Sequence, residues 1–171
     1  WSHLPIRPIA LSGWDNRTFH LGEKMLIRMP SAAEYAAQPE KEHYWLPKLA
    51  PLLPLSIPTP LALGKPAEDY LWKWSIYQWL EGETAALVYI ANLNDFATSL
   101  AEFLLAFEGI DSTGGPLAGP HSFYRGGSLI TYDNETRKAI ALLKDRLEVD
   151  TALQVWEIGL STFWNGPPVW V

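Results

Sequence analysis

The chain has 171 residues, of which 48% are hydrophobic and 19% charged, which is enough apolar material for a folded core and excludes a wholly disordered chain. At about 100–200 residues per domain, this length fits one domain or a compact two-lobed unit. The net charge of −6 argues against a general nucleic-acid binder, because such proteins usually present a basic face. The sequence contains no cysteine, which excludes disulfides, thiolate metal sites and cysteine nucleophiles.

The N-terminal third predicts three consecutive strands. Residues 8–11, 17–21 and 24–29 are short segments with strand-like composition. A cluster of turn formers at residues 12–16 separates the first two, and Gly22 lies in the connection between the second and the third. Together these segments predict an antiparallel β-meander.

A helix is predicted after the third strand. Pro39 fits the first helical position, and Glu42 follows in a region where acidic side chains suit the helix dipole. Pro47 predicts a kink or a split in this helix. Beyond a proline-rich connection, residues 61–64 and 70–80 predict two more strands, so the first 80 residues carry five strands and one inserted helix.

The remainder of the chain is predominantly helical. Apolar side chains recur with helical spacing between residues 94 and 107, and Gly/Pro-rich residues 112–127 predict a long loop. Asp133 can cap a helix that runs to about residue 147, and Asp150 can cap another. The side chains expected to face inward in these two helices are Ile140, Leu143, Leu147, Leu153, Trp156, Leu160 and Phe163. The fold class is therefore α+β.

This order of elements, a β-meander, a helix, two strands, a short acidic connection and then helices, is that of the protein-kinase-like fold. Within it, five sequence pieces stand out, namely residues 26–30 (Leu-Ile-Arg-Met-Pro), Glu42 followed by Leu46 and Leu49, residues 58–61, residues 79–83 (Trp-Leu-Glu-Gly-Glu) and residues 164–171. On these pieces the chain resembles the aminoglycoside phosphotransferase family, from about residue 4 to residue 171.

The resemblance implies a nucleotide-binding N-lobe over residues 1–80 and an incomplete helical C-lobe over residues 81–171. In the family, a Pro-Val-Trp-Val sequence leads directly into the catalytic His-Gly-Asp loop, and a later Asn and Asp hold Mg²⁺. Because those positions would lie beyond Val171, the resemblance implies the N-terminal portion of an ATP-dependent small-molecule O-phosphotransferase, inert by itself. It also implies ATP and Mg²⁺ as cofactors and a small hydroxyl-bearing acceptor.

Arg28 and Glu42 are the leading candidates for binding phosphates. Kinases place a cation on the third strand that reaches the nucleotide phosphates and pairs with a helix glutamate, and a guanidinium can grip a phosphate with two N–H groups. Strand alternation puts Arg28 on the same face as Leu26. Ile9 and Ile27 are candidate walls of the adenine pocket. An ordinary surface ion pair is the alternative interpretation.

Two other segments complete the predicted nucleotide site. Ser12 and Gly13 lie where a kinase has its phosphate-covering loop, although a plain hairpin turn is the interpretation that the sequence alone favours. Gln78, Trp79 and Leu80 fall on the segment that joins the lobes, where kinases bind the adenine edge through backbone groups. An aromatic core strand is an equally good interpretation of that segment.

Several alternatives stay open. The chain can belong to another small-molecule kinase of the superfamily, acting on choline, homoserine or fructosamine, to a noncatalytic pseudokinase-like binding module, or to a complete α+β domain. The four histidines lack the spacing of a metal site. No apolar run reaches the roughly 18 residues that a membrane span requires. We therefore expect a cytoplasmic protein with neither membrane nor nucleic acid as a partner.

Overall fold

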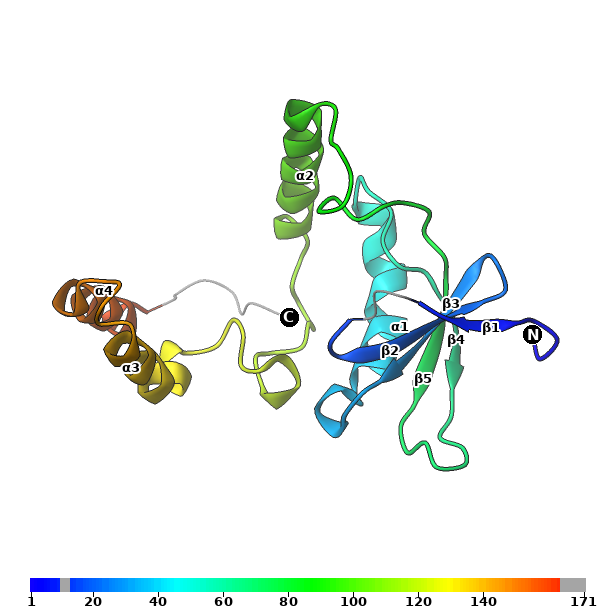
Figure 1. The fold of residues 1–171 in the computed structure, drawn as a ribbon, viewed down its shortest axis with the longest axis horizontal. Helices are drawn as coiled ribbons and strands as arrows, with labels where there is room; N and C mark the ends of the chain where they lie inside the picture. Colours follow the sequence, from blue (N-terminus) through cyan, green and yellow to red (C-terminus); the bar gives the residue numbers. More distant parts are fainter. Residues whose placement is uncertain (10–12, 164–171) are drawn as a thin grey trace. The chain divides into compact units, whose positions relative to one another are not determined.

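A computed structural model describes residues 1–9 and 13–163 of the chain (Figure 1). The chain forms two compact units, Trp1–Asp111 and Ser112–Val171. The functional division expected at residue 80 is a different boundary, and it stays a prediction. Ser12 and the sequence piece at residues 164–171 lie outside the described residues.

The first unit is built on a five-stranded antiparallel sheet with the order β1-β2-β3-β5-β4. Gly22 has a positive φ of 61° and closes the tight connection between the second and third strands. The strands are β1 (Ile6–Pro8), β2 (Asn16–Leu21), β3 (Met25–Pro30), β4 (Pro60–Gly64) and β5 (Trp74–Gln78). The predicted α+β class and the five-stranded sheet with its inserted helix are confirmed.

The two faces of the sheet carry different side chains. Arg28 is paired with Ser75, and Leu26 with Tyr77, so these four residues share one face. Ile27 is paired with Ile76 on the opposite face, where the hydrophobic core lies. The buried core residues there are Leu21, Ile27 and Ile76, with Leu4, Phe19, Met25, Met29, Ala62 and Trp74 packed against them.

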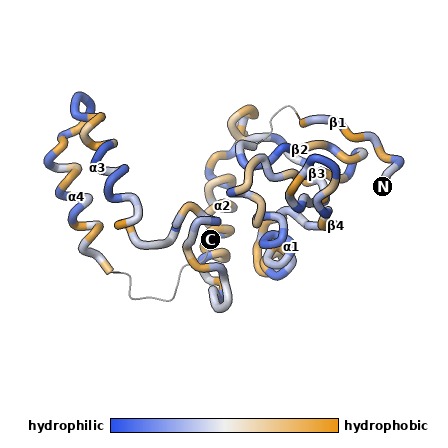
Figure 2. Tube along the Cα trace, turned by 90° about the horizontal axis from the view of Figure 1, so that it is seen from below, coloured by the Kyte–Doolittle hydropathy of each residue, from blue (hydrophilic) through white to orange (hydrophobic). Residues whose placement is uncertain are grey.

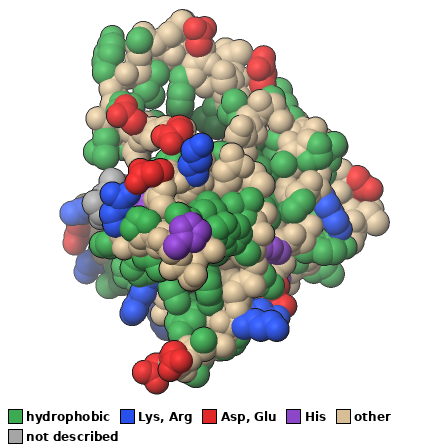
Figure 3. All heavy atoms as spheres, turned by 90° about the vertical axis from the view of Figure 1, so that its right-hand side faces the viewer, with side chains coloured by type: hydrophobic (Ala, Val, Ile, Leu, Met, Phe, Trp, Pro, Cys, Tyr) green, Lys and Arg blue, Asp and Glu red, His purple; other side chains and the backbone are tan. Residues whose placement is uncertain are grey.

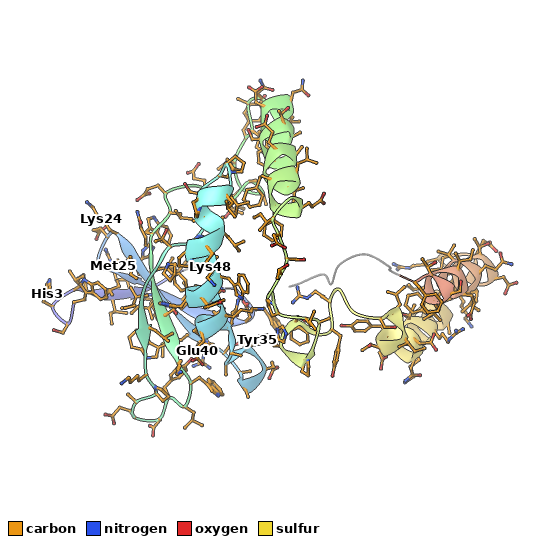
Figure 4. The ribbon with its side chains drawn as sticks, turned by 180° about the vertical axis from the view of Figure 1, so that it is seen from behind. His3, Lys24, Met25, Tyr35, Glu40 and Lys48 are labelled. Carbon is orange, nitrogen blue, oxygen red and sulfur yellow. The ribbon has the colours of Figure 1, made fainter. Side chains whose placement is uncertain are left out.

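Helix α1 (Gln38–Leu49) lies beside the sheet (Figures 1 and 4). The hydrogen bonds between Arg28 and Glu42 place the helix on the face of the sheet that carries Arg28. Short 3₁₀ turns flank it at Ala33–Tyr35 and Ala50–Leu52. The split expected at Pro47 is wrong, because the helix continues to Leu49. Since Pro47 lies in the last turn, it removes a hydrogen bond only where the helix is about to end.

Two strand predictions need correction at their boundaries. The first strand lies at Ile6–Pro8 rather than at residues 8–11. The last strand is shorter than residues 70–80, because Tyr70 instead forms an isolated bridge with Ala67. The Tyr70 hydroxyl also donates to the carbonyl of Pro30 at 2.9 Å, which ties this turn to the end of β3.

Helix α2 (Leu93–Glu108) completes the first unit. Asn92 is its N-cap, and the Asn92 side chain accepts hydrogen bonds from the backbone N–H groups of Asn94 and Asp95. Hydrophobic positions recur along the helix (Figure 2), yet none of its residues is buried. The predicted helix is therefore confirmed, but its apolar face has no buried core in the described part of the chain.

The second unit contains α3 (Asp133–Leu142) and α4 (Val149–Ser161), with 3₁₀ turns at Pro120–Ser122 and Leu129–Tyr132. Asp133 begins α3 rather than capping it, because its carboxylate accepts from Arg137 and Trp156 of the two helices.

Helix α3 ends at Leu142, five residues before the predicted end at about residue 147. A turn follows it, in which the Leu143 carbonyl accepts hydrogen bonds from the N–H groups of Arg146 and Leu147. Leu143 and Phe163 are exposed, so their expected inward positions are wrong.

Among the residues that the structure describes, no helix has both the length and the apolar character needed to cross a membrane.

Candidate functional site

An ion pair between Arg28 of β3 and Glu42 of α1 forms the centre of the candidate site. The Arg28 Nη1 atom donates to both Glu42 carboxylate oxygens, at 3.1 and 3.3 Å. The two side chains are only 24% and 15% exposed, so solvent screens this pair less than it would screen a surface pair. The pairing predicted from the sequence is confirmed, and its role toward nucleotide stays a prediction.

Two more side chains complete the environment of the Glu42 carboxylate. The Tyr77 hydroxyl donates to Oε2, and the Gln38 amide donates to Oε1 at 2.8 Å. Gln38 lies one helical turn before Glu42, which is the spacing that places two side chains on the same helix face. Each carboxylate oxygen therefore accepts hydrogen bonds from two directions, which fixes its orientation.

Tyr77 is almost fully buried, at 1% exposure, between the sheet and α1. Burial raises the pKa of Tyr77, and the charge of Glu42 and the hydrogen bond to it raise that pKa further. The phenol thus keeps its proton at neutral pH and acts as a donor to Glu42. The guanidinium carbon of Arg28 lies 5.4 Å from the centre of the Tyr77 ring, within cation–π range.

Arg28 retains donors that the protein does not use. A guanidinium carries five N–H donors, and Glu42 engages only those on Nη1. Within residues 1–9 and 13–163, the Nε and Nη2 groups of Arg28 have no hydrogen-bond partner. An oriented cation with free, planar donors is suited to binding a phosphate.

The turn that precedes β2 lies at the same end of the sheet as Arg28. Ser31, just after β3, holds this turn through its hydroxyl to the Trp14 carbonyl at 3.0 Å and its N–H to the Asp15 carbonyl at 2.9 Å. A Cβ atom built on Gly13 would meet only a side-chain oxygen of Asp15, at 3.2 Å. Local packing therefore allows a close backbone approach at Gly13, while its predicted phosphate role is untested.

The predicted adenine segment lies at the other end of β3. The Trp79 N–H donates to the Lys24 carbonyl at 2.9 Å, and the Trp79 ring lies 4.3 Å from the ring of His20. Lys24 marks the β2–β3 hairpin in Figure 4. From Lys24 to Arg28 the strand rises about 13 Å. The backbone N–H of Leu80 has no acceptor among the described residues, so it is available to a ligand.

Side chains between these two ends line one continuous sheet face. Thr18 is paired with Arg28, and His20 with Leu26, so all four share the face that holds the ion pair. Ile27 points to the opposite face and into the core, which makes its predicted place in an adenine pocket wrong. The arrangement offers a polar, cationic end and an aromatic end on a single surface.

A cavity of about 280 Å³ lies beside the adenine segment, on the side of the loop that follows α1. Gln78 and Leu80 line it, whereas Arg28 and Glu42 do not. The remaining lining residues are Ala50, Leu53, Pro54, Leu55, Ser56, Ile57 and Thr59. This cavity is therefore separate from the phosphate-binding candidates.

A metal site is not formed by the described part of the chain, which holds no group of three His, Asp or Glu side chains positioned to bind an ion. The residues present fit the anionic part of a nucleotide instead, through the free donors of Arg28. The carboxylates Glu81 and Glu83 are exposed.

Two residues of the site, Tyr77 and Gln38, were not predicted from the sequence. The i, i+4 spacing from Gln38 to Glu42 could have identified Gln38 as a partner of the carboxylate. Tyr77 was hidden in an aromatic-rich stretch, and only the register that pairs Leu26 with Tyr77 places its hydroxyl near α1.

Comparison with known families settles the relationship of the chain. The model of the phosphotransferase enzyme family matches residues 5–171. The chain belongs to this family. No curated protein matches the chain significantly.

Solved structures of aminoglycoside and macrolide phosphotransferases share the kinase-like fold of the chain. The GDP and kanamycin complex of APH(2")-IIIa matches 92% of this chain with a TM-score of 0.60 and 18% identity, and 52% of that protein is covered. The streptomycin–ATP complex of APH(2")-IIa matches 91% of the chain with a TM-score of 0.51 and 17% identity, covering 52% of that protein.

The macrolide 2'-phosphotransferase MphH from Brachybacterium faecium matches 94% of the chain with a TM-score of 0.52 and 19% identity, covering 54% of that protein. The chain thus spans about half the length of the solved structures it matches. At these identities the likeness shows the fold, and the phosphotransferase family is shown by the family model.

Proposed function

We propose that this chain forms the nucleotide-binding half of a phosphotransferase that moves the γ-phosphoryl group of Mg-ATP to a hydroxyl of a small molecule. The observation that carries the proposal is the Arg28–Glu42 pair, which is held in place by its surroundings while Arg28 keeps unused donors. Membership of the phosphotransferase family and the GDP, ADP and ATP complexes of its structural neighbours support a nucleotide as the ligand.

Each predicted residue has a distinct role in this proposal. Arg28 binds the phosphates, and Glu42 orients it. In this proposal Gly13 lets the backbone come close to the phosphates, Ser12 adds a hydroxyl donor, and the backbone of residues 78–80 holds the adenine edge. The proposal assigns neither the binding of Mg²⁺ nor the acceptance of the hydroxyl proton to a residue of this chain.

The proposed acceptor is a polyhydroxylated small molecule of the aminoglycoside or macrolide kind. The proposed location of the protein is the cytoplasm. Structural neighbours were solved with kanamycin, streptomycin and gentamicin, and one is a macrolide phosphotransferase. The exposed carboxylates Glu81 and Glu83 suit a cationic acceptor. Choline, homoserine and fructosamine remain the alternative acceptors within the same reaction class.

The test is a phosphotransfer assay on a protein that carries this chain together with the rest of the family domain. Mg-ATP is offered with kanamycin, a macrolide, choline, homoserine or fructosamine, and release of ADP is followed. Arg28→Ala should lower kcat/KM by about 100-fold, because it removes an oriented charge from the phosphates. Arg17→Ala is the matched control, since Arg17 is exposed on the neighbouring strand and pairs with Met29 on the opposite face.

Equal activity of Arg28→Ala and the wild type would contradict the proposed role of Arg28. Nucleotide binding without turnover on any acceptor would support the pseudokinase-like alternative instead.

A further inference from the structure

Three side chains from three different elements converge on the Glu42 carboxylate. Arg28 comes from β3, Tyr77 from β5 and Gln38 from the first turn of α1. Arg28 donates to both oxygens, Tyr77 to Oε2 and Gln38 to Oε1. Because Glu42 is only 15% exposed, water alone would satisfy this charge poorly if a donor left.

The donors differ in how freely they can move. Arg28 is a long side chain that the proposed phosphates would attract, and any movement toward them weakens its bonds to Glu42. Tyr77 is buried in the sheet and cannot follow, so its hydroxyl keeps contact with Oε2. The buried phenol in turn has Glu42 as its acceptor, and losing that acceptor would leave a buried donor unpaired.

The ring of Tyr77 adds a second restraint. Its centre lies 5.4 Å from the guanidinium carbon of Arg28, so the ring limits where the cation can lie. One side chain thus contacts both members of the ion pair. Burial and the Glu42 charge raise the pKa of Tyr77, which keeps the hydroxyl a donor throughout the neutral range.

We infer that Tyr77 is a positioning residue of the proposed phosphate site, an inference that rests on the proposed function. With Gln38, it holds the Glu42 carboxylate in the orientation that aims Arg28 at the phosphates. Glu42 thereby stays neutralised while Arg28 shares its donors between the carboxylate and the ligand. Tyr77 acts through Glu42 and Arg28 and has no contact with the reacting atoms.

The test is calorimetric titration of Mg-ATP into the protein that carries this chain and the rest of the family domain. Tyr77→Phe removes the hydroxyl and keeps the ring, and we expect about a 10-fold weaker affinity, as for loss of a hydrogen bond to a charged group. Tyr70→Phe is the matched control. The Tyr70 hydroxyl donates to the Pro30 carbonyl, away from Glu42, so the Tyr70→Phe variant should bind Mg-ATP with the affinity of the wild type.

A double-mutant cycle separates positioning from a merely structural role. If Tyr77 acts through Glu42, Tyr77→Phe should have no further effect on affinity in a Glu42→Ala background. Gln38→Ala is a second variant, for which we expect the affinity for Mg-ATP to fall by about 3-fold. This effect should also disappear in a Glu42→Ala background. This variant keeps the test decisive even if Tyr77→Phe does not fold.

The possible failures are distinguishable. Absence of nucleotide binding by the wild type would overturn the proposed function, and the inference with it. Wild-type binding that Arg28→Ala weakens and Tyr77→Phe leaves unchanged would overturn the inference alone. An equal effect of Tyr77→Phe with and without Glu42 would also overturn it, because the hydroxyl would then act elsewhere.

Discussion

The sheet and helix α2 belong to the same unit but bury their apolar side chains very differently. In the sheet, Ile27 and Ile76 are 7% and 6% exposed. In α2, Leu104 is 49% exposed and no residue is buried. Apolar side chains are widespread on the face drawn in Figure 3.

This contrast shows which part of the molecule can fix a site. Burial of the sheet core supplies a stabilising free energy that does not depend on the helices. The side chains around Glu42 belong to this sheet and to α1, so their geometry rests on a packed core. Helix α2 instead depends on its own hydrogen bonds and its cap, which makes its order more sensitive to local changes.

The largest effect should follow a cavity in the sheet core. Ile27→Ala should lower the free energy of unfolding by about 2–5 kcal/mol, because it removes buried methyl groups and leaves a void. Leu104→Ala in α2 is the comparison, with an expected loss below about 1 kcal/mol for a half-exposed side chain. Urea denaturation measures both. Equal losses would show that the two regions do not differ as described.

A steric clash at the edge of the sheet should cause the second-largest loss of stability. A Cβ atom on Gly64 would lie 2.1 Å from the ring of Trp74, whose Nε1 donates to the Lys65 carbonyl. Gly64→Ala should therefore cost about 1–3 kcal/mol, since the indole must shift. Gly109→Ala at the end of α2 meets only ordinary contacts, at 3.4 Å or more, and should leave stability nearly unchanged. Thermal unfolding of both variants provides the comparison.

The cap of α2 tests the dependence of that helix on local hydrogen bonds. Asn92→Ala removes the acceptor for the N–H groups of Asn94 and Asp95 and should cost about 1 kcal/mol. The loss should appear as reduced helical circular dichroism at temperatures below the main transition. Asn92→Asp keeps the acceptor and should restore the signal. A full signal in Asn92→Ala would show that α2 is held by something other than its cap.

Tyr77 should make the stability of the sheet fall at alkaline pH. Its pKa is raised from 10.0, so the folded protein keeps the phenol neutral where the unfolded chain loses the proton. The contribution of this group is complete below pH 10 and is lost as the pH rises above it. Between pH 10 and pH 11, the free energy of unfolding of the wild type should fall by about 1 kcal/mol more than that of Tyr77→Phe. Tyr89→Phe, which alters an exposed side chain, should behave as the wild type.

Much of the fold could be predicted from the sequence, because its signals are local. Each of these signals depends on a few neighbouring residues. Examples are the turn glycine Gly22, Pro39 at a helix start and the spacing of apolar residues in α2. Helix ends were harder to predict. The end of α3 depends on the turn at Leu143, and the place of Asp133 depends on its contact with Trp156 of another helix.

The site was predictable only in part for the same reason. Resemblance to a family identified Arg28 and Glu42, and their pairing was confirmed. Strand alternation alone would have excluded Ile27, because it lies between Leu26 and Arg28 and must face the other way. Tyr77 required the register between β3 and β5, which is a long-range property that no local pattern encodes.

The most direct test of the proposed nucleotide site is the affinity of Arg28→Ala for nucleotide. Calorimetric titration with Mg-ATP would compare it with the wild type and with Arg17→Ala, whose side chain lies on the opposite face. We expect the affinity of Arg28→Ala to fall by about 30-fold or more, as for removal of a charge-assisted phosphate contact, and that of Arg17→Ala to stay unchanged. Identical affinities of all three proteins would contradict the assignment of the Arg28 face of the sheet as a nucleotide site.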